Sequence, residues 1–188
     1  MKRLEIVFTK SKKFFPVISW LIRWWTSVMT SGFKGIFKLF PYSHVARSIQ
    51  IKNWGRRYYQ ASEGRVNYEF EKFFIKKHNI VKKYELEVSV EVDREIKKAC
   101  YEEAGNKYAS WQNIGIFLTD IYFKIFHKEK ENPWKKGRNC SEILYAKCFK
   151  IMIPELDYDE NKIKPHEIEQ IILKYFRKTS NDTWILKM

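Results

Sequence analysis

Cys140 stands where a loop gives way to an apolar run, in the stretch Gly137-Arg138-Asn139-Cys140-Ser141-Glu142-Ile143-Leu144-Tyr145. Gly137 marks the loop, and the apolar residues after Cys140 recur at helical spacing, which predicts a helix that begins near Cys140. The first turn of a helix is the positive end of its dipole, and this end stabilises a thiolate. Cys140 is therefore a candidate nucleophile. The competing interpretation is a small buried hydrophobic residue, the usual role of a lone cysteine.

His44 is the candidate partner of this thiol. It lies far upstream, in Pro41-Tyr42-Ser43-His44-Val45-Ala46, at the start of a short apolar run after a proline break. A cysteine and a histidine that are distant in sequence but adjacent in the fold form the reactive pair of thiol hydrolases. Because a free cysteine has a pKa of about 8.5, a nearby imidazole is needed to populate the thiolate at neutral pH. The alternative for His44 is a core histidine with its hydrogen bonds satisfied.

The composition predicts one folded domain that spans residues 1–188. The chain has 188 residues, of which 45% are hydrophobic and 17% aromatic, enough for one core and too few for two. The formal net charge of +14 favours anionic partners such as acidic substrates or lipid surfaces. The positive residues are spread along the chain and form no single stripe with interleaved aromatic residues, so specific nucleic-acid recognition is not expected.

Three cysteines and no C-x-x-C pair argue against a disulfide framework and against a structural zinc site. We expect free thiols in a reducing compartment, with Cys100 and Cys148 buried and no metal or cofactor. The remaining histidines, His78, His127 and His166, lie among charged residues and are expected to face solvent.

The segment Phe14–Met29 is apolar and rich in tryptophan, but it contains Arg23 and is shorter than the ~20 apolar residues that a membrane span needs. We interpret it as an amphipathic helix that packs on the domain. The alternative is an interfacial membrane helix with tryptophans at the lipid headgroups. With no secretory signal recognised, we expect a cytoplasmic monomer, and peripheral association with an anionic membrane stays open.

The remaining pattern predicts a mixture of strands and helices. Strands are expected at Leu4–Phe8, 44–49, 57–61, 65–68, 80–90 and 183–186, and helices at about 15–28, 69–77, 93–103, 111–125, from Cys140 onward, and 165–175. Asp93 is expected to cap the helix that follows it.

Four short motifs, in this order, resemble the circularly permuted papain-fold cysteine hydrolases, the YiiX-like branch of the NlpC-type superfamily of cell-wall amidases and peptidases. They are Tyr42-Ser43-His44-Val45-Ala46, Tyr58-Tyr59-Gln60-Ala61, Gly105-Asn106-Lys107-Tyr108 and Asn139-Cys140-Ser141-Glu142-Ile143. The resemblance extends from about Leu4 to Pro165. It implies an α+β fold, with an antiparallel sheet or partial barrel on which the nucleophile helix packs.

The resemblance also implies the roles of the site residues. His44 is the general base, Cys140 the nucleophile, and Gln60 the residue that orients the imidazole. Relatives often carry glutamate at the position of Gln60, and an amide brings no negative charge to support the imidazolium. Glu63 is the nearest alternative carboxylate in the sequence, and Tyr42 is a candidate to line the substrate site or donate to the oxyanion.

The main functional hypothesis is a cysteine hydrolase that cleaves an amide bond in a peptide or peptidoglycan-type substrate. A second hypothesis keeps the fold and changes the bond, to a lipid-acting acyltransferase or lipase, because related permuted proteins act on lipids. A third is a non-enzymatic basic binding protein.

Overall fold

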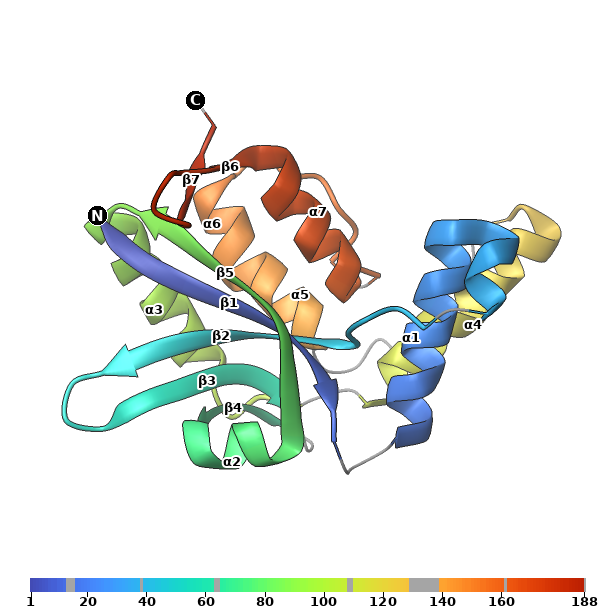
Figure 1. Ribbon diagram of the computed structural model, residues 1–188, viewed down its shortest axis with the longest axis horizontal. Helices are drawn as coiled ribbons and strands as arrows, with labels where there is room; N and C mark the ends of the chain where they lie inside the picture. The colour runs from blue at the N-terminus through green and yellow to red at the C-terminus, as the bar shows by residue number, and fades with distance from the viewer. Residues whose placement is uncertain are drawn as a thin grey trace.

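Seven strands form one open sheet, and two of the candidate residues, His44 and Gln60, lie on it (Figure 1). The computed structural model describes residues 1–12, 16–37, 39–62, 65–107, 110–128, 139–160 and 162–187. The strands are β1 (Lys2–Ser11), β2 (His44–Ile51), β3 (Gly55–Ser62), β4 (Arg65–Phe70), β5 (His78–Val88), β6 (Phe176–Lys178) and β7 (Trp184–Leu186). They are ordered β4-β3-β2-β1-β5-β7-β6, and neighbours are antiparallel except β5 and β7, which run parallel.

The helices divide into a layer on the sheet and a pair beside it (Figure 1). The layer comprises α3 (Val90–Glu103), α5 (Cys140–Leu144), a π-helical turn η2 (Tyr145–Phe149), α6 (Lys150–Met152) and α7 (Pro165–Tyr175). The short α2 (Glu71–Lys77) lies on the other side of the sheet. The pair comprises α1 (Pro16–Ser31), which leads into the 3₁₀ turn η1 (Gly32–Phe37), and α4 (Ser110–Phe126). None of the helices in the described parts of the chain is long and apolar enough to cross a membrane.

The alternation of side chains along β1 separates two cores. Leu4, Ile6 and Phe8 are buried in the larger core, under the helical layer. Val7 points to the opposite side, where the ring of Phe74 from α2 completes a second, smaller buried cluster. Successive residues of a strand face opposite sides, so a strand with both faces covered is apolar almost throughout. This explains the unbroken apolar run at the centre of β1.

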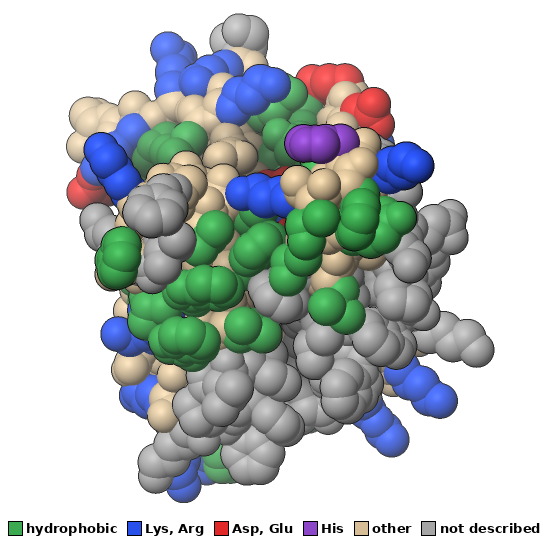
Figure 2. Space-filling model, turned by 90° about the vertical axis from the view of Figure 1, so that its right-hand side faces the viewer, with side chains coloured by type: hydrophobic (Ala, Val, Ile, Leu, Met, Phe, Trp, Pro, Cys, Tyr) green, Lys and Arg blue, Asp and Glu red, His purple; other side chains and the backbone are tan. Residues whose placement is uncertain are grey.

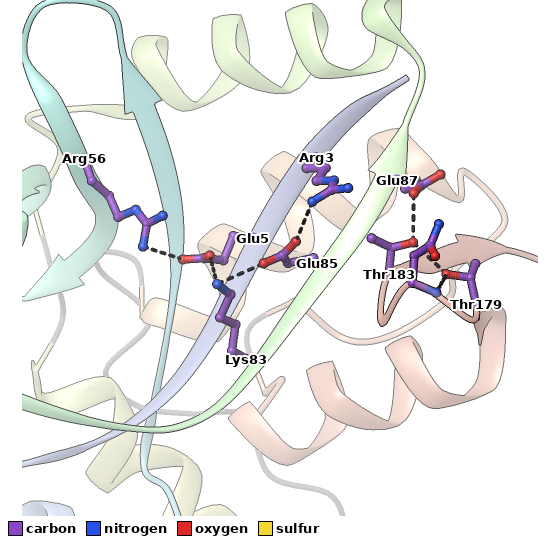
Figure 3. Close-up of polar contacts among 9 residues, drawn as sticks. Arg3, Glu5, Arg56, Lys83, Glu85, Glu87, Thr179 and Thr183 are labelled. Carbon is purple, nitrogen blue, oxygen red and sulfur yellow. Dashed lines mark hydrogen bonds and ion pairs between the residues drawn. The ribbon is translucent and has the colours of Figure 1, made fainter.

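A network of charged side chains lies on the α2 side of the sheet (Figure 3). Glu5 of β1 lies 3.8 Å from Arg56 of β3 and 2.6 Å from Lys83 of β5. Lys83 also contacts Glu85 at 2.9 Å, and Glu85 contacts Arg3 at 3.5 Å. Exposed ion pairs of this kind add little stability each, but they keep this face of the sheet wet.

The resemblance implies an antiparallel sheet or a partial barrel; the sheet is instead mixed, and it does not close into a barrel. Its described edges are β4 and β6. The outer edge of β4 is instead covered by the chain after α3: the Val66 N–H donates to the Asn106 carbonyl at 2.9 Å, and the Gly105 N–H donates to the Val66 carbonyl at 2.9 Å. The Gly105-Asn106-Lys107 motif therefore protects an edge strand.

The short β6–β7 hairpin adds the parallel pairing. The Thr183 hydroxyl donates to Glu87 of β5 at 2.8 Å, and it lies 2.8 Å from the Thr179 hydroxyl across the turn (Figure 3). These contacts fix the end of the chain on β5.

The sequence pattern predicted that Asp93 caps α3, and this prediction is wrong. The cap is Ser89, whose hydroxyl accepts the N–H of Val92 at 3.1 Å, so the helix begins one turn earlier. The carboxylate of Asp93 is instead used in a buried ion pair with Arg47 of β2, at 3.2 Å.

Candidate active site

Cys140 is the first residue of α5 and is almost fully buried. Asn139 caps the helix: its side-chain oxygen accepts the Glu142 N–H at 2.8 Å, and the Glu142 carboxylate accepts the Asn139 N–H at 3.3 Å. This reciprocal capping box satisfies N–H groups that the helix itself cannot. The helix continues through the η2 turn and α6 to Met152. The thiol therefore lies at the N-terminus of a helix that is long enough for its dipole to favour the thiolate.

His44 is the first residue of β2, where the strand starts opposite Thr9 of β1. The preceding N–H, from Ser43, donates to the Thr9 carbonyl at 3.0 Å and holds the entry to the strand in place. The imidazole lies close enough to the Cys140 thiol for each group to shift the pKa of the other, and the backbone of Val45 also lies near the sulfur. A helix end and a strand end thus meet at one sulfur atom.

Gln60 of β3 fixes the orientation of the imidazole. Its Nε2 donates to the Glu69 carboxylate at 2.6 Å, which turns Oε1 toward His44, and Oε1 lies 2.7 Å from His44 Nε2. Since a carbonyl oxygen can only accept, Nε2 must carry the proton of this hydrogen bond. Nδ1 is then the ring nitrogen left for the thiol. Lys77 of α2 completes the chain of contacts with a 2.7 Å ion pair to Glu69.

The electrostatics of the site favour a thiolate–imidazolium pair. Burial works against the charged imidazole, but the negative charge of Cys140 and the hydrogen bonds to Cys140 and Gln60, with a smaller effect of the Glu69 charge, raise the pKa of His44. Burial likewise opposes the thiolate, yet the positive charge of His44 and its hydrogen bond lower the pKa of Cys140, helped by Val45 and the Ser141 hydroxyl. The two groups titrate as a pair.

A second histidine stacks on the first. The rings of His78 and His44 lie 5.0 Å apart, at an interplanar angle of 15°, and His78 also contacts the ring of Phe74 at 4.7 Å. Burial and the positive charges of His44 and Lys77 lower the pKa of His78 to about 3. His78 is therefore a neutral ring that covers the imidazole, and its predicted exposure to solvent is wrong.

The structure brings His44, Gln60 and Cys140 together and turns Tyr42 elsewhere. The Tyr42 hydroxyl donates to the buried carboxylate of Glu169 on α7, which also accepts from Tyr84 at 2.5 Å. The role of Tyr42 in substrate binding stays a prediction, and its visible role is to anchor the segment before His44. Glu63, the alternative orienting carboxylate, lies outside the described residues.

Glu69 and His78 are the site residues that sequence reasoning missed. Glu69 faces Tyr58 across the β3–β4 pair, and Gln60 faces Asn67, so Gln60 and Glu69 are diagonal neighbours on the same side of the sheet. The register has a local signal in the sequence, because the two strands follow each other closely along the chain and Ser62 pairs with Arg65. His78 had no comparable signal, since its place depends on the packing of α2.

Cys100 and Cys148 are free thiols at a separate location, as expected. Both are fully buried near the Arg47 guanidinium, which lies 3.6 Å from the sulfur of Cys100. Burial and the proximity of Cys100 raise the pKa of Cys148, whereas hydrogen bonding to Cys148, together with Arg47, lowers that of Cys100. Of the three thiols, Cys140 alone is paired with an imidazole in the described structure.

Comparison of the chain with protein-family models, with curated proteins and with solved structures finds no match.

Proposed function

We propose that the protein is a cysteine hydrolase that cleaves an amide bond through a covalent acyl-enzyme, on a permuted papain-like version of the α+β fold. The observation that carries this proposal is the chain of contacts from Cys140 to His44 to Gln60, with the thiol at a helix N-terminus. This arrangement contains an activated nucleophile, a base and a residue that orients the base. In a Cys-His-carboxylate site the carboxylate contacts the imidazole directly, whereas here Gln60 lies between His44 and the Glu69 carboxylate.

The first half-reaction acylates the enzyme. The Cys140 thiolate attacks the substrate carbonyl carbon and forms a C–S bond, while the carbonyl oxygen becomes an oxyanion. The backbone N–H of Cys140, which lies in the first turn of its helix and has no acceptor there, can donate to this oxyanion. The His44 imidazolium then transfers its proton to the departing amine, the C–N bond breaks, and a thioester remains.

The second half-reaction releases the acyl group. Neutral His44 takes a proton from water, and the oxygen attacks the thioester carbonyl. The C–S bond breaks, the carboxylic acid leaves, and the thiolate–imidazolium pair forms again. Throughout both steps the hydrogen bond to Gln60 keeps Nε2 protonated and Nδ1 directed at the reacting atoms.

The substrate class proposed is a peptide or peptidoglycan-type amide, and the +14 net charge suits an anionic substrate. The test is a hydrolysis screen with peptide amides and peptidoglycan stem peptides. Cys140→Ala should abolish turnover, and His44→Ala should lower kcat by about 10²–10⁴-fold. Cys148→Ala and His127→Ala are the matched controls and should keep activity. Turnover that survives Cys140→Ala would refute the proposal.

An ester bond in a lipid is the second candidate, and one observation favours it: large apolar side chains, such as Trp20 and Phe126, are exposed on the helix pair beside the site. The same nucleophile would then transfer or release a fatty acyl group. Acylation of Cys140 by a phospholipid, seen as a mass increase, would favour this candidate over the peptide substrate.

A further inference from the structure

The helix pair beside the sheet leaves large apolar side chains in solvent. Figure 2 faces this part of the molecule and shows hydrophobic side chains gathered on it, with Lys and Arg among and around them. The exposed apolar residues of α1, η1 and α4 are Trp20, Phe37, Leu118, Phe123, Ile125 and Phe126, and we call them the α1–α4 face. Large exposed apolar areas on a soluble protein often mark an interaction surface.

The polar groups of the helix pair are used on its inner side. The Trp25 indole N–H donates to Asp120 of α4 at 3.0 Å, and the same carboxylate lies 2.7 Å from Lys164 at the start of α7. The Arg23 Nε donates to the Phe40 carbonyl at 2.6 Å. These contacts orient the pair on the domain. The last turn of α4 then projects outward, with Ile125 63% and Phe126 56% exposed.

Basic residues outnumber acidic ones on these segments. Residues 16–37 and 110–128 contain Arg23, Lys34, Lys124 and Lys128, and Asp120 is their one acidic residue. Lys34, Lys124 and Lys128 are exposed, whereas Asp120 is turned inward to Trp25 and Lys164. The surface presented to a partner is therefore apolar and cationic.

We propose that the α1–α4 face docks on the surface of an anionic lipid bilayer. Tryptophan and phenylalanine at headgroup depth, with lysines reaching the lipid phosphates, are the features of an interfacial helix. Trp20 already stacks on Trp24, with ring centroids 6.1 Å apart, so the aromatic surface is preformed. A second copy of the chain fits less well, because a twofold contact would bring identical lysine-bearing faces together. Such docking places the helices along the bilayer surface; among the described residues no helix is long and apolar enough to cross a membrane.

Docking by this face would place the candidate active site near lipid. Phe40, which exchanges backbone and side-chain hydrogen bonds with Arg23 of α1, is four residues before His44. This consequence rests on the proposed function, whereas the docking itself does not. We therefore test docking with the Cys140→Ala protein, so that a failure to bind lipid and a failure to hydrolyse are separate results.

The experiment is flotation of the full chain with vesicles of phosphatidylcholine alone and of phosphatidylcholine with phosphatidylglycerol in equal parts. We expect the protein to float with the anionic vesicles and to be released as salt is raised. Ile125→Ser/Phe126→Ser should reduce the bound fraction about tenfold, because it removes apolar area that would insert between the lipids. Both side chains are solvent-exposed, so the fold should tolerate the change. Lys124→Glu/Lys128→Glu should remove the preference for anionic lipid.

Matched controls come from the opposite end of β2. Trp54→Ser and Tyr101→Ser remove exposed aromatic residues there, beside a surface hollow that Lys97 and Lys98 also line. Lys98→Glu/Lys174→Glu makes the same change of charge elsewhere. All three controls should float like the parent. Parent protein that stays unbound, equal loss in face and control variants, or a dimer that Ile125→Ser/Phe126→Ser converts to a monomer without change in flotation would each overturn the proposal.

Discussion

The hydrogen bonds around Gln60 show how a carboxylate can support the imidazole although an amide stands next to it. Gln60 Nε2 is 2.6 Å from Glu69, so a negative charge supports the imidazole through the amide rather than by direct contact. A second carboxylate at position 60 would repel the first. These two neighbouring side chains therefore accommodate a single negative charge, which Glu69 of β4 carries.

At residue scale the first prediction concerns pH. Because the pKa of Cys140 is lowered, its thiolate exists below the ordinary thiol range and is lost as pH falls through the depressed value. Iodoacetamide should therefore alkylate Cys140 rapidly at neutral pH. In His44→Ala, burial is no longer opposed by the imidazolium, so the rate at neutral pH should fall by about tenfold or more. Mass mapping identifies the thiol, and equal pH profiles in both proteins would contradict the prediction.

The second prediction is a charge exchange between strands β3 and β4. Gln60→Glu alone should slow alkylation of Cys140, since two carboxylates would meet at a contact that is now 2.6 Å, and one must take up a proton. Glu69→Gln alone should slow it by about twofold, because a charge that contributes to the raised pKa of His44 is lost.

The double variant Gln60→Glu/Glu69→Gln restores one carboxylate and one amide. We expect it to recover at least the parent alkylation rate, with the charge now next to His44. Glu71→Gln, on the nearby α2, is the matched control and should change little. If the two single losses simply add in the double variant, Gln60 and Glu69 do not act as one unit.

At element scale, the nucleophile depends on the cap of its helix. Asn139→Ala removes the acceptor for the Glu142 N–H and should lower the free energy of unfolding by about 1 kcal/mol. Asn139→Ser keeps an acceptor and should lose only part of this. Urea unfolding measures both, and alkylation of Cys140 should slow in the same order because the first turn holds the thiol. Equal stability of Asn139→Ala and the parent would show that the cap is not needed.

Elements whose signal is local could be predicted from the sequence. The helix at Pro165–Tyr175 has its expected bounds, because proline favours the first turn and the apolar spacing carries the rest. The strand expected at Leu4–Phe8 is longer, Lys2–Ser11, since β2 and β5 pair with polar residues at its ends as well. The π-helical turn after Leu144 has no sequence signature and follows from packing.

At the scale of the whole molecule, the only sequence evidence that the site residues meet was the order of their motifs along the chain. His44 and Cys140 are 96 positions apart, and their meeting depends on β2 lying inside the sheet with α5 packed against it. The motif order indicated this pairing. It could not indicate Glu69 behind Gln60, or the open mixed sheet, because both depend on register and edge pairing between distant segments.

The buried ion pair between Arg47 and Asp93 ties the sheet to the helical layer, and it is the last test. Arg47 is 2% exposed in the centre of β2. Its side chain stays charged there, because a guanidinium group keeps its proton. Asp93→Ala would leave this charge without its carboxylate in the core. Removing one partner of a buried pair costs about 3–5 kcal/mol, so we expect a loss of that size in urea unfolding.

Arg47→Met/Asp93→Leu removes both charges and fills the space with apolar groups. It should be much less destabilised than Asp93→Ala, because no charge is left unpaired. Lys97→Met is the control, since Lys97 contacts Asp93 from the exposed side at 2.5 Å and should cost under about 1 kcal/mol. A double variant as unstable as Asp93→Ala would mean that the two side chains specify the docking of α3 on β2. A stable double variant that still alkylates at Cys140 would separate the support of the fold from the support of the site.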